Sequence, residues 1–173
     1  FVGGHTLTVQ NQVTVLGGSL YFEDDASLYQ ITDVANAPGV YSGGNSGNIT
    51  SERDAAPMFR YDYTYWSTPV SPQTLIGFSP DSPLFFYFDP AVGNWAYANT
   101  TAPMVPGKGY LIRAPDAAPF NVTTPNNYLG SFIGVPNTGN ISLPVVGNAN
   151  QFNLIGNPYP SALSADAFLS DPV

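Results

Sequence analysis

Apolar side chains recur at every second position in many short stretches of this chain, and this period of two limits the fold more than any other feature. It indicates half-buried β-strands, because successive side chains of a strand point to opposite faces of a sheet. The chain has 173 residues with 17 glycines and 17 prolines, so turns separate the stretches. The sequence therefore predicts an all-β fold that is long enough to bury a sizeable core.

The first 31 residues contain four such stretches, whose apolar pairs begin at positions 7, 13, 20 and 28. This spacing suits either tight hairpins or the rungs of a small β-solenoid, and four degenerate units do not decide between them. Residues 35–50 are rich in glycine and lack apolar periodicity, which predicts a long loop or a boundary. We therefore divide the chain into an N-terminal short-strand segment with its loop, residues 1–50, and a β-sandwich-like module, residues 51–173.

Within the second part, residues 61–65 alternate cleanly, residues 84–88 form a continuous aromatic run, and residues 110–112 and 132–135 read as further strands. One short C-terminal helix is predicted over residues 161–169. Its potential caps are Ser161 and Ser164, and Asp171-Pro172 would end it.

Two six-residue motifs have similar sequences. Residues 45–50 and 137–142 share the pattern Asn-(Ser/Thr)-Gly-Asn-Ile-(Ser/Thr). We interpret them as two similar turns that enter strands. The second motif predicts a hairpin between residues 132–135 and 141–146, because glycine and asparagine tolerate a positive φ.

Charge and cysteine content exclude several classes of function. The chain has 4 basic and 12 acidic residues, which gives a net charge of −8. Binding to nucleic acids or to anionic membrane surfaces requires clustered basic side chains, so both are excluded as partners. The chain has no cysteine, so a disulfide, a thiol nucleophile and a Cys-ligated zinc are excluded. No apolar run approaches the roughly 18 residues that a membrane-spanning helix needs, so we expect no membrane insertion.

Catalytic motifs are equally scarce. The single histidine, His5, lies at the start of the chain, and no Gly-x-Ser-x-Gly elbow accompanies it. The Gly107-Lys108-Gly109 segment lacks the remainder of a phosphate-binding loop and reads as a turn. No spacing nominates a carboxylate pair for glycoside hydrolysis, which leaves a hydrolase as the third hypothesis. We predict no catalytic residue and no intrinsic enzymatic activity.

Acidic residues near the N-terminus raise the question of a metal. Glu23, Asp24 and Asp25, together with Asp33, can offer oxygen ligands to a structural calcium ion, although no EF-hand pattern is present. We favour a solvated acidic turn and predict no cofactor, with structural calcium as the alternative.

Aromatic residues are the strongest ligand-binding candidates. Tyr61, Tyr63 and Tyr65 share one face of a predicted strand, and Trp66 and Trp95 occur beside polar residues. Together they can form a flat platform on which sugar rings stack. An all-β core must also be filled by large side chains, so we favour core packing over a platform and predict that Trp66 is more buried than exposed.

Three segments resemble a module of large secreted proteins from Bacteroidota of the flavobacterial, gliding type. They are MFRYDYTYWSTPV at 58–70, PGKGYLIRAP at 106–115 and FNLIGNPYPSALSADAFL at 152–169. Their order and spacing resemble the module across residues 55–173, and the short strands of residues 6–31 resemble, more weakly, the segment that precedes it. The Asn-Pro-Tyr-Pro motif at 157–160 also predicts a rigid corner next to the core, because each proline fixes its own φ and restricts the residue before it.

The resemblance implies a secreted or cell-surface protein exported by the type IX secretion system, and it offers no catalytic residues. Such modules continue past the Asp-Pro pair after the helix, so we expect the chain to be truncated at its C-terminal end and to be a piece of a longer exported polypeptide. The leading hypothesis is a non-enzymatic structural or adhesive module. Its partners would be export machinery during secretion, then extracellular polysaccharide or other surface proteins. The alternative is a carbohydrate-binding module with an aromatic platform; a further alternative is a cargo fragment captured with export machinery.

Overall fold

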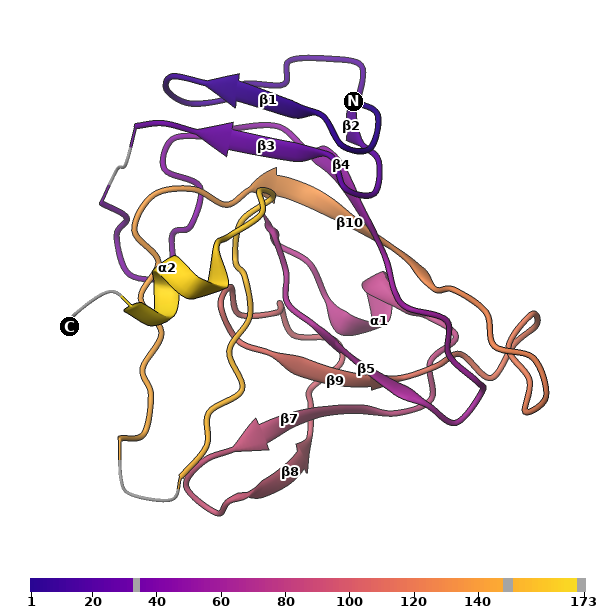
Figure 1. The fold of residues 1–173 in the computed structure, drawn as a ribbon. Helices are drawn as coiled ribbons and strands as arrows, with labels where there is room; N and C mark the ends of the chain where they lie inside the picture. Colours follow the sequence, from indigo (N-terminus) through magenta and orange to yellow (C-terminus); the bar gives the residue numbers. More distant parts are fainter. Residues whose placement is uncertain (33–34, 148–150, 171–173) are drawn as a thin grey trace.

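The computed structural model describes residues 1–32, 35–147 and 151–170, and it confirms the all-β prediction (Figure 1). Most of the regular structure belongs to three sheets, with the strand orders β1-β3, β2-β4-β10-β6 and β5-β9-β7-β8. The strands are β1 (Thr6–Val9), β2 (Leu20–Phe22), β3 (Ser27–Gln30), β4 (Ile49–Asp54), β5 (Tyr63–Trp66), β6 (Val70–Ser71), β7 (Phe85–Asp89), β8 (Asn94–Tyr97), β9 (Tyr110–Arg113) and β10 (Leu129–Pro136), and the helices are α1 (Leu75–Phe78) and α2 (Ala165–Ser170).

The N-terminal segment is a small β-solenoid. Strand β1 pairs in parallel with β3, strand β2 pairs in parallel with β4, and Thr14 forms a parallel bridge with Ser46. Two-residue hairpins would have produced antiparallel pairs, so the parallel pairing decides between the two alternatives that the sequence left open. The stacked coils lie at the top of Figure 1.

Strand β4 joins the solenoid to the rest of the molecule. It pairs with β2 on one side and, antiparallel, with β10 on the other. The division that we placed after residue 50 falls inside this strand, so the two predicted parts share one sheet. The long loop predicted for residues 35–50 is irregular up to Asn48, after which β4 begins.

The two four-stranded sheets pack in a sandwich-like arrangement around an aromatic core. Phe132 of β10 stacks on Phe78 of α1 with ring centroids 4.3 Å apart, and the Trp66 ring of β5 meets Phe78 edge-on at 4.8 Å. Ile112 of β9 and Val70 of β6 are also fully or almost fully buried in this cluster. Aromatic pairs of this geometry add stability beyond the burial of their area.

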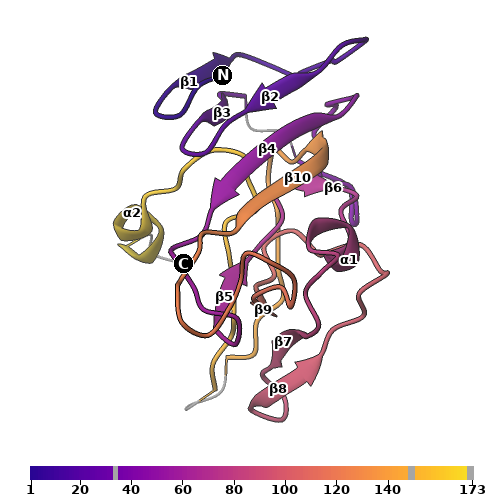
Figure 2. The same ribbon diagram turned by 90° about the vertical axis from the view of Figure 1, so that its right-hand side faces the viewer.

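The two helices differ in how well they were predicted. The C-terminal helix α2 lies where expected but begins at Ala165, because Ser164 acts as its cap and its Oγ accepts a hydrogen bond from the Ala167 amide at 3.2 Å. Helix α1 was not predicted, since its single turn is too short to produce a helical periodicity. The Thr74 hydroxyl caps it by accepting a hydrogen bond from the Gly77 amide. Figure 2 shows α1 beside β10, on which it packs.

The predicted hairpin after β10 is wrong, because the chain leaves β10 toward another partner. The Thr138 amide donates to the Tyr41 carbonyl, and Asn140 bridges Ala35 in parallel. Residues 141–146 form no strand, and both backbone groups of Val146 bond to the Asn153 side chain instead. The first of the two similar motifs, residues 45–50, leads into strand β4, whereas the second, residues 137–142, leads into no strand.

The Asn-Pro-Tyr-Pro corner is confirmed. Pro158 and Pro160 are buried, and the Asn157 side chain accepts a hydrogen bond from the Tyr159 amide at 2.9 Å. The carbonyl of Pro158 accepts a hydrogen bond from the buried side chain of Asn137. This contact fixes the C-terminal segment against the end of β10.

Candidate functional site

One face of the sheet β5-β9-β7-β8 points away from the core, and we call it the outer face. The register places Tyr65 opposite Leu111, Leu111 opposite Phe86, and Phe86 opposite Tyr97. Because directly opposed residues share a face, these side chains and their neighbours two positions along lie together. The outer face comprises Tyr63, Tyr65, Phe86, Phe88, Trp95 and Tyr97, with Leu111 and Arg113 from β9 between them.

The outer face is exposed to solvent. Tyr97 is 75% exposed, Tyr65 62%, Tyr63 42% and Trp95 38%, whereas Phe86 and Phe88 are half-buried. Isolated exposed apolar side chains are ordinary, but a contiguous exposed aromatic patch usually marks a binding site.

Ring contacts connect the aromatic side chains of the outer face into two groups. Tyr65 stacks with Trp95 at a centroid distance of 6.3 Å and an interplanar angle of 26°, and Trp95 meets Phe88 edge-on at 5.5 Å. Tyr63 contacts Phe86 at 6.2 Å, and Phe86 contacts Tyr97 at 4.9 Å. The six rings thus form two connected groups that cross the sheet.

The structure brings together three of the five residues proposed for an aromatic platform: Tyr63, Tyr65 and Trp95. Tyr61 lies in the turn before β5, 57% exposed, with its ring 5.5 Å from the Arg113 guanidinium. Trp66 lies on the opposite face, half-buried and packed against the core, so it is more buried than exposed, as predicted; neighbouring residues of a strand face opposite ways. It therefore does not belong to the platform.

Sequence reasoning missed three aromatic residues of the outer face: Phe86, Phe88 and Tyr97. The first two stand in a continuous apolar run, which is typical of a strand buried on both faces and so does not reveal an exposed one. Tyr97 had a usable signal, since it follows Trp95 by two positions in the same strand.

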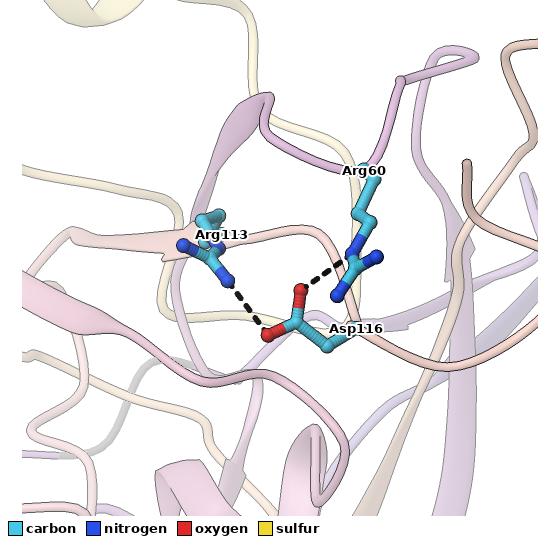
Figure 3. A network of polar contacts seen from close by, with 3 residues as sticks. All are labelled: Arg60, Arg113 and Asp116. Atoms are coloured by element: carbon cyan, nitrogen blue, oxygen red, sulfur yellow. Dashed lines mark hydrogen bonds and ion pairs between the residues drawn. The ribbon is translucent and has the colours of Figure 1, made fainter. Parts of the chain in front are cut away.

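A charged network borders the outer face (Figure 3). Asp116 accepts hydrogen bonds from Arg60 Nε at 2.9 Å and from Arg113 Nη2 at 2.7 Å. The hydrogen bond from Arg60, with the charge of Arg113, lowers the pKa of the Asp116 carboxyl group below its ordinary value. The network holds the Arg113 side chain at the end of β9, beside the Tyr61 ring.

A cavity of about 280 Å³ lies beside Tyr65 at the free edge of β5. Its lining includes Arg53, Ser67, Gly156 and Asn157. The Ala114 amide donates a hydrogen bond to the Asp62 carbonyl, and backbone groups along an antiparallel strand point alternately toward and away from the partner strand. The even-numbered residues of β5 therefore bond to β9. The backbone amide and carbonyl groups of Tyr65, an odd-numbered residue, point to the free edge instead, where they can meet a ligand.

The remaining candidates do not form a site. Among residues 1–32, 35–147 and 151–170, no three His, Cys, Asp or Glu side chains are grouped to hold a metal ion. Asp24 instead accepts a hydrogen bond from the Asp54 amide at 2.8 Å, and Asp33 lies outside the described residues. His5 is exposed. Lys108 follows the left-handed Gly107 in a turn and places its Nζ 3.7 Å from the Tyr87 ring centroid.

Comparisons with known proteins place the chain in a family but give it no function. The family described as "Domain of unknown function (DUF8693)" matches residues 2–172. No curated protein and no solved structure matches the chain. Within the part of the chain that the structure describes, no helix has the length and apolar character to cross a membrane.

Proposed function

The chain belongs to the DUF8693 family, whose function is unknown, and we propose from the outer face that it is a non-enzymatic adhesive module that binds polysaccharide. The observation that carries this proposal is the presence of two adjacent groups of aromatic rings, four of them exposed, on one face of the sheet β5-β9-β7-β8. These rings favour carbohydrate binding, which would give an adhesive module its means of attachment.

Aromatic rings suit sugars for a physical reason. The C–H faces of a pyranose are apolar and pack on aromatic rings, while its hydroxyl groups remain at the edges for hydrogen bonds. Tyr65 and Trp95 offer two neighbouring exposed rings with centroids 6.3 Å apart, so one sugar chain can contact both. The phenolic hydroxyls of Tyr63, Tyr65 and Tyr97 can bond to the sugar hydroxyls at the rim.

Charge favours a neutral polysaccharide. The chain carries a net charge of −8, which would repel a strongly acidic glycan. The two arginines that border the outer face share Asp116 as a counter-ion, so they form no free cationic patch there. A neutral chain avoids repulsion and can still accept hydrogen bonds from the arginines.

We also propose that the module belongs to a secreted or cell-surface protein of Bacteroidota exported by the type IX secretion system. The support is the resemblance of residues 55–173 to modules of such proteins. Surface labelling of intact cells, with a deletion of the secretion system as the control, tests this part. Labelling that persists unchanged in the deletion strain contradicts it.

Polysaccharide pull-down tests the binding proposal. The chain is incubated with insoluble neutral polysaccharides, such as cellulose, chitin and β-glucan, and the depletion of protein from the supernatant gives a Kd for each. We expect the double variant Tyr65→Ala/Trp95→Ala to bind about 5- to 150-fold more weakly, since each aromatic contact contributes about 0.5–1.5 kcal/mol.

The matched control is Tyr29→Ala. Tyr29 is 51% exposed but lies on β3 of the solenoid, away from the outer face. It should bind like the unmodified chain. If the double variant binds every retained polysaccharide as tightly as the control, the outer face is not the binding surface.

A further inference from the structure

The apolar interior at the N-terminal end of the solenoid is only partly covered. The first coil consists of β1, residues 13–15 and β2, and the second consists of β3, residues 45–46 and β4. Leu28 and Ile49 of the second coil are 2% and 1% exposed. Their partners in the first coil, Leu7 and Leu20, are only partly buried, as are Val9 and Val15.

Phe1 already occupies a position above this coil. Its amino group donates to the Tyr21 carbonyl at 2.5 Å, and its carbonyl accepts from the Glu23 amide at 2.9 Å. These two bonds are the pattern of a parallel bridge between Phe1 and Phe22. The two phenyl rings stack as well, with centroids 5.3 Å apart and an interplanar angle of 12°.

The spacing of Phe1 matches that of the β1-β3 pair, whereas the longer loop before residue 45 gives the other two pairs of the solenoid larger offsets. Phe22 follows Phe1 by 21 residues, and Ser27 follows its partner Thr6 by the same 21 residues. Phe22 pairs on its other side with Ser51 of β4. Phe1 therefore stands where the last strand residue of a preceding coil would stand.

The edge of β1 is open to such a coil. The bonds from the Ser27 amide to the His5 carbonyl and from the Ile31 amide to the Val9 carbonyl direct the odd-numbered residues of β1 toward β3. The amide and carbonyl groups of Thr6 and Thr8 consequently point outward. No backbone group among the described residues bonds to them there.

We propose that this end of the solenoid is a docking surface for one further parallel β-coil that runs into Phe1 from its N-terminal side. The coil pairs with β1 and with residues 13–15, and it places apolar residues over Leu7, Val9, Val15 and Leu20. A second copy of the chain is disfavoured as the occupant. A two-fold axis would set β1 antiparallel to its mate, whereas the pairing of Phe1 continues the ladder in parallel.

The test adds a coil of known sequence to the chain. A copy of residues 2–21 is placed before Phe1, so that Phe1 follows the copied Tyr21 and the 21-residue period is kept. The matched control carries the same extension with serine at the copied positions 7, 9, 13, 15 and 20. Amide hydrogen exchange of Thr6 and Thr8 is measured by NMR in both extended proteins, together with the urea midpoint.

We expect the apolar extension to slow exchange at Thr6 and Thr8 by about tenfold or more relative to the serine control and to raise the urea midpoint. Equal exchange at these two amides in both proteins overturns the proposal. A 173-residue chain that dimerises in solution and protects the same amides only as it dimerises also overturns it, since the occupant is then a second copy.

Discussion

The rings of Tyr65 and Trp95 stack although their strands, β5 and β8, form opposite edges of one four-stranded sheet. Their side chains must therefore lean toward each other across the outer face, above β9 and β7. The contact connects the two edges of the sheet by aromatic packing alone. It also brings the two rings proposed to stack sugar units within 6.3 Å of each other.

Asn137→Ala should destabilise the fold strongly. The Asn137 side chain is 1% exposed, donates to the carbonyls of Thr68 and Pro158, and accepts from the Ser71 hydroxyl. Its removal leaves buried carbonyl groups without a partner, at a cost of about 1–3 kcal/mol. Urea unfolding measures this loss. Asn127→Ala is the control, because its bond to Asp54 is exposed, and it should change stability by less than about 0.5 kcal/mol. Equal losses in both variants would contradict the account.

Gly156→Ala should destabilise by steric conflict, and Ser67→Gly should relieve it. A Cβ atom on Gly156 would lie 2.5 Å from the Ser67 Cβ atom, closer than such atoms approach. We expect an interaction energy of about 0.5–3 kcal/mol between the two substitutions in a double-mutant cycle of unfolding free energies.

Gly147→Ala is the control for this cycle, since a Cβ there meets no atom within 4 Å. It should be neutral or slightly stabilising. Strict additivity of the Gly156 and Ser67 substitutions would show that the C-terminal segment does not approach β5 as closely as described.

The Asp116 network should stabilise the fold only above acidic pH. The hydrogen bond from Arg60 lowers the pKa of Asp116 in the folded protein, so the unfolded chain takes up this proton first as the pH falls. The stabilisation is present above the ordinary carboxyl pKa of about 3.9 and is lost as the pH falls through the lowered value. It should be small, since the pair is exposed.

Urea midpoints of the unmodified chain and of Asp116→Asn, compared at pH of about 6 and about 2, measure this effect. The midpoints should differ at the higher pH and converge at the lower one. A difference that is larger at the lower pH would contradict the assignment of the network.

Local patterns predicted some of this molecule well. Tyr63 and Tyr65 stand two positions apart in one strand, and this period of two is enough to place them on a shared face. The corner at Pro158 and Pro160 was predictable because proline acts on its own backbone. Helix α2 had its cap, Ser164, within the predicted range.

Long-range relationships could not be predicted in the same way. Asn45 and Asn137 look like ordinary turn residues, yet both are buried, and the Asn45 side chain donates to the Pro136 carbonyl at 2.9 Å. Which face of β7 is covered depends on where β10 packs, so Phe86 and Phe88 gave no sign of being at the surface. The choice between hairpin and solenoid depends on the partner of each strand, which a period of two does not specify.

We predict that the module does not turn over the polysaccharide that it binds. Incubation with the polysaccharides retained in the pull-down should release no new reducing ends, since no nucleophile or acid–base pair was identified in the sequence. Release that disappears when a single carboxylate is replaced would contradict this prediction and favour a hydrolase.

Acrylamide quenching of Trp95 fluorescence tests the central claim most directly. The chain has two tryptophans, and Trp66 packs against the core on the opposite face of the sheet, so a Trp66→Phe variant reports on Trp95 alone. A soluble neutral oligosaccharide of the retained class should shield Trp95 from acrylamide, and Tyr65→Ala should weaken that shielding. Trp66 lines the cavity beside Tyr65, so the reciprocal Trp95→Phe variant shows whether the ligand also reaches that cavity. If quenching of Trp95 is the same with and without saturating bound oligosaccharide, the ligand does not lie on the outer face, and the proposed function is wrong.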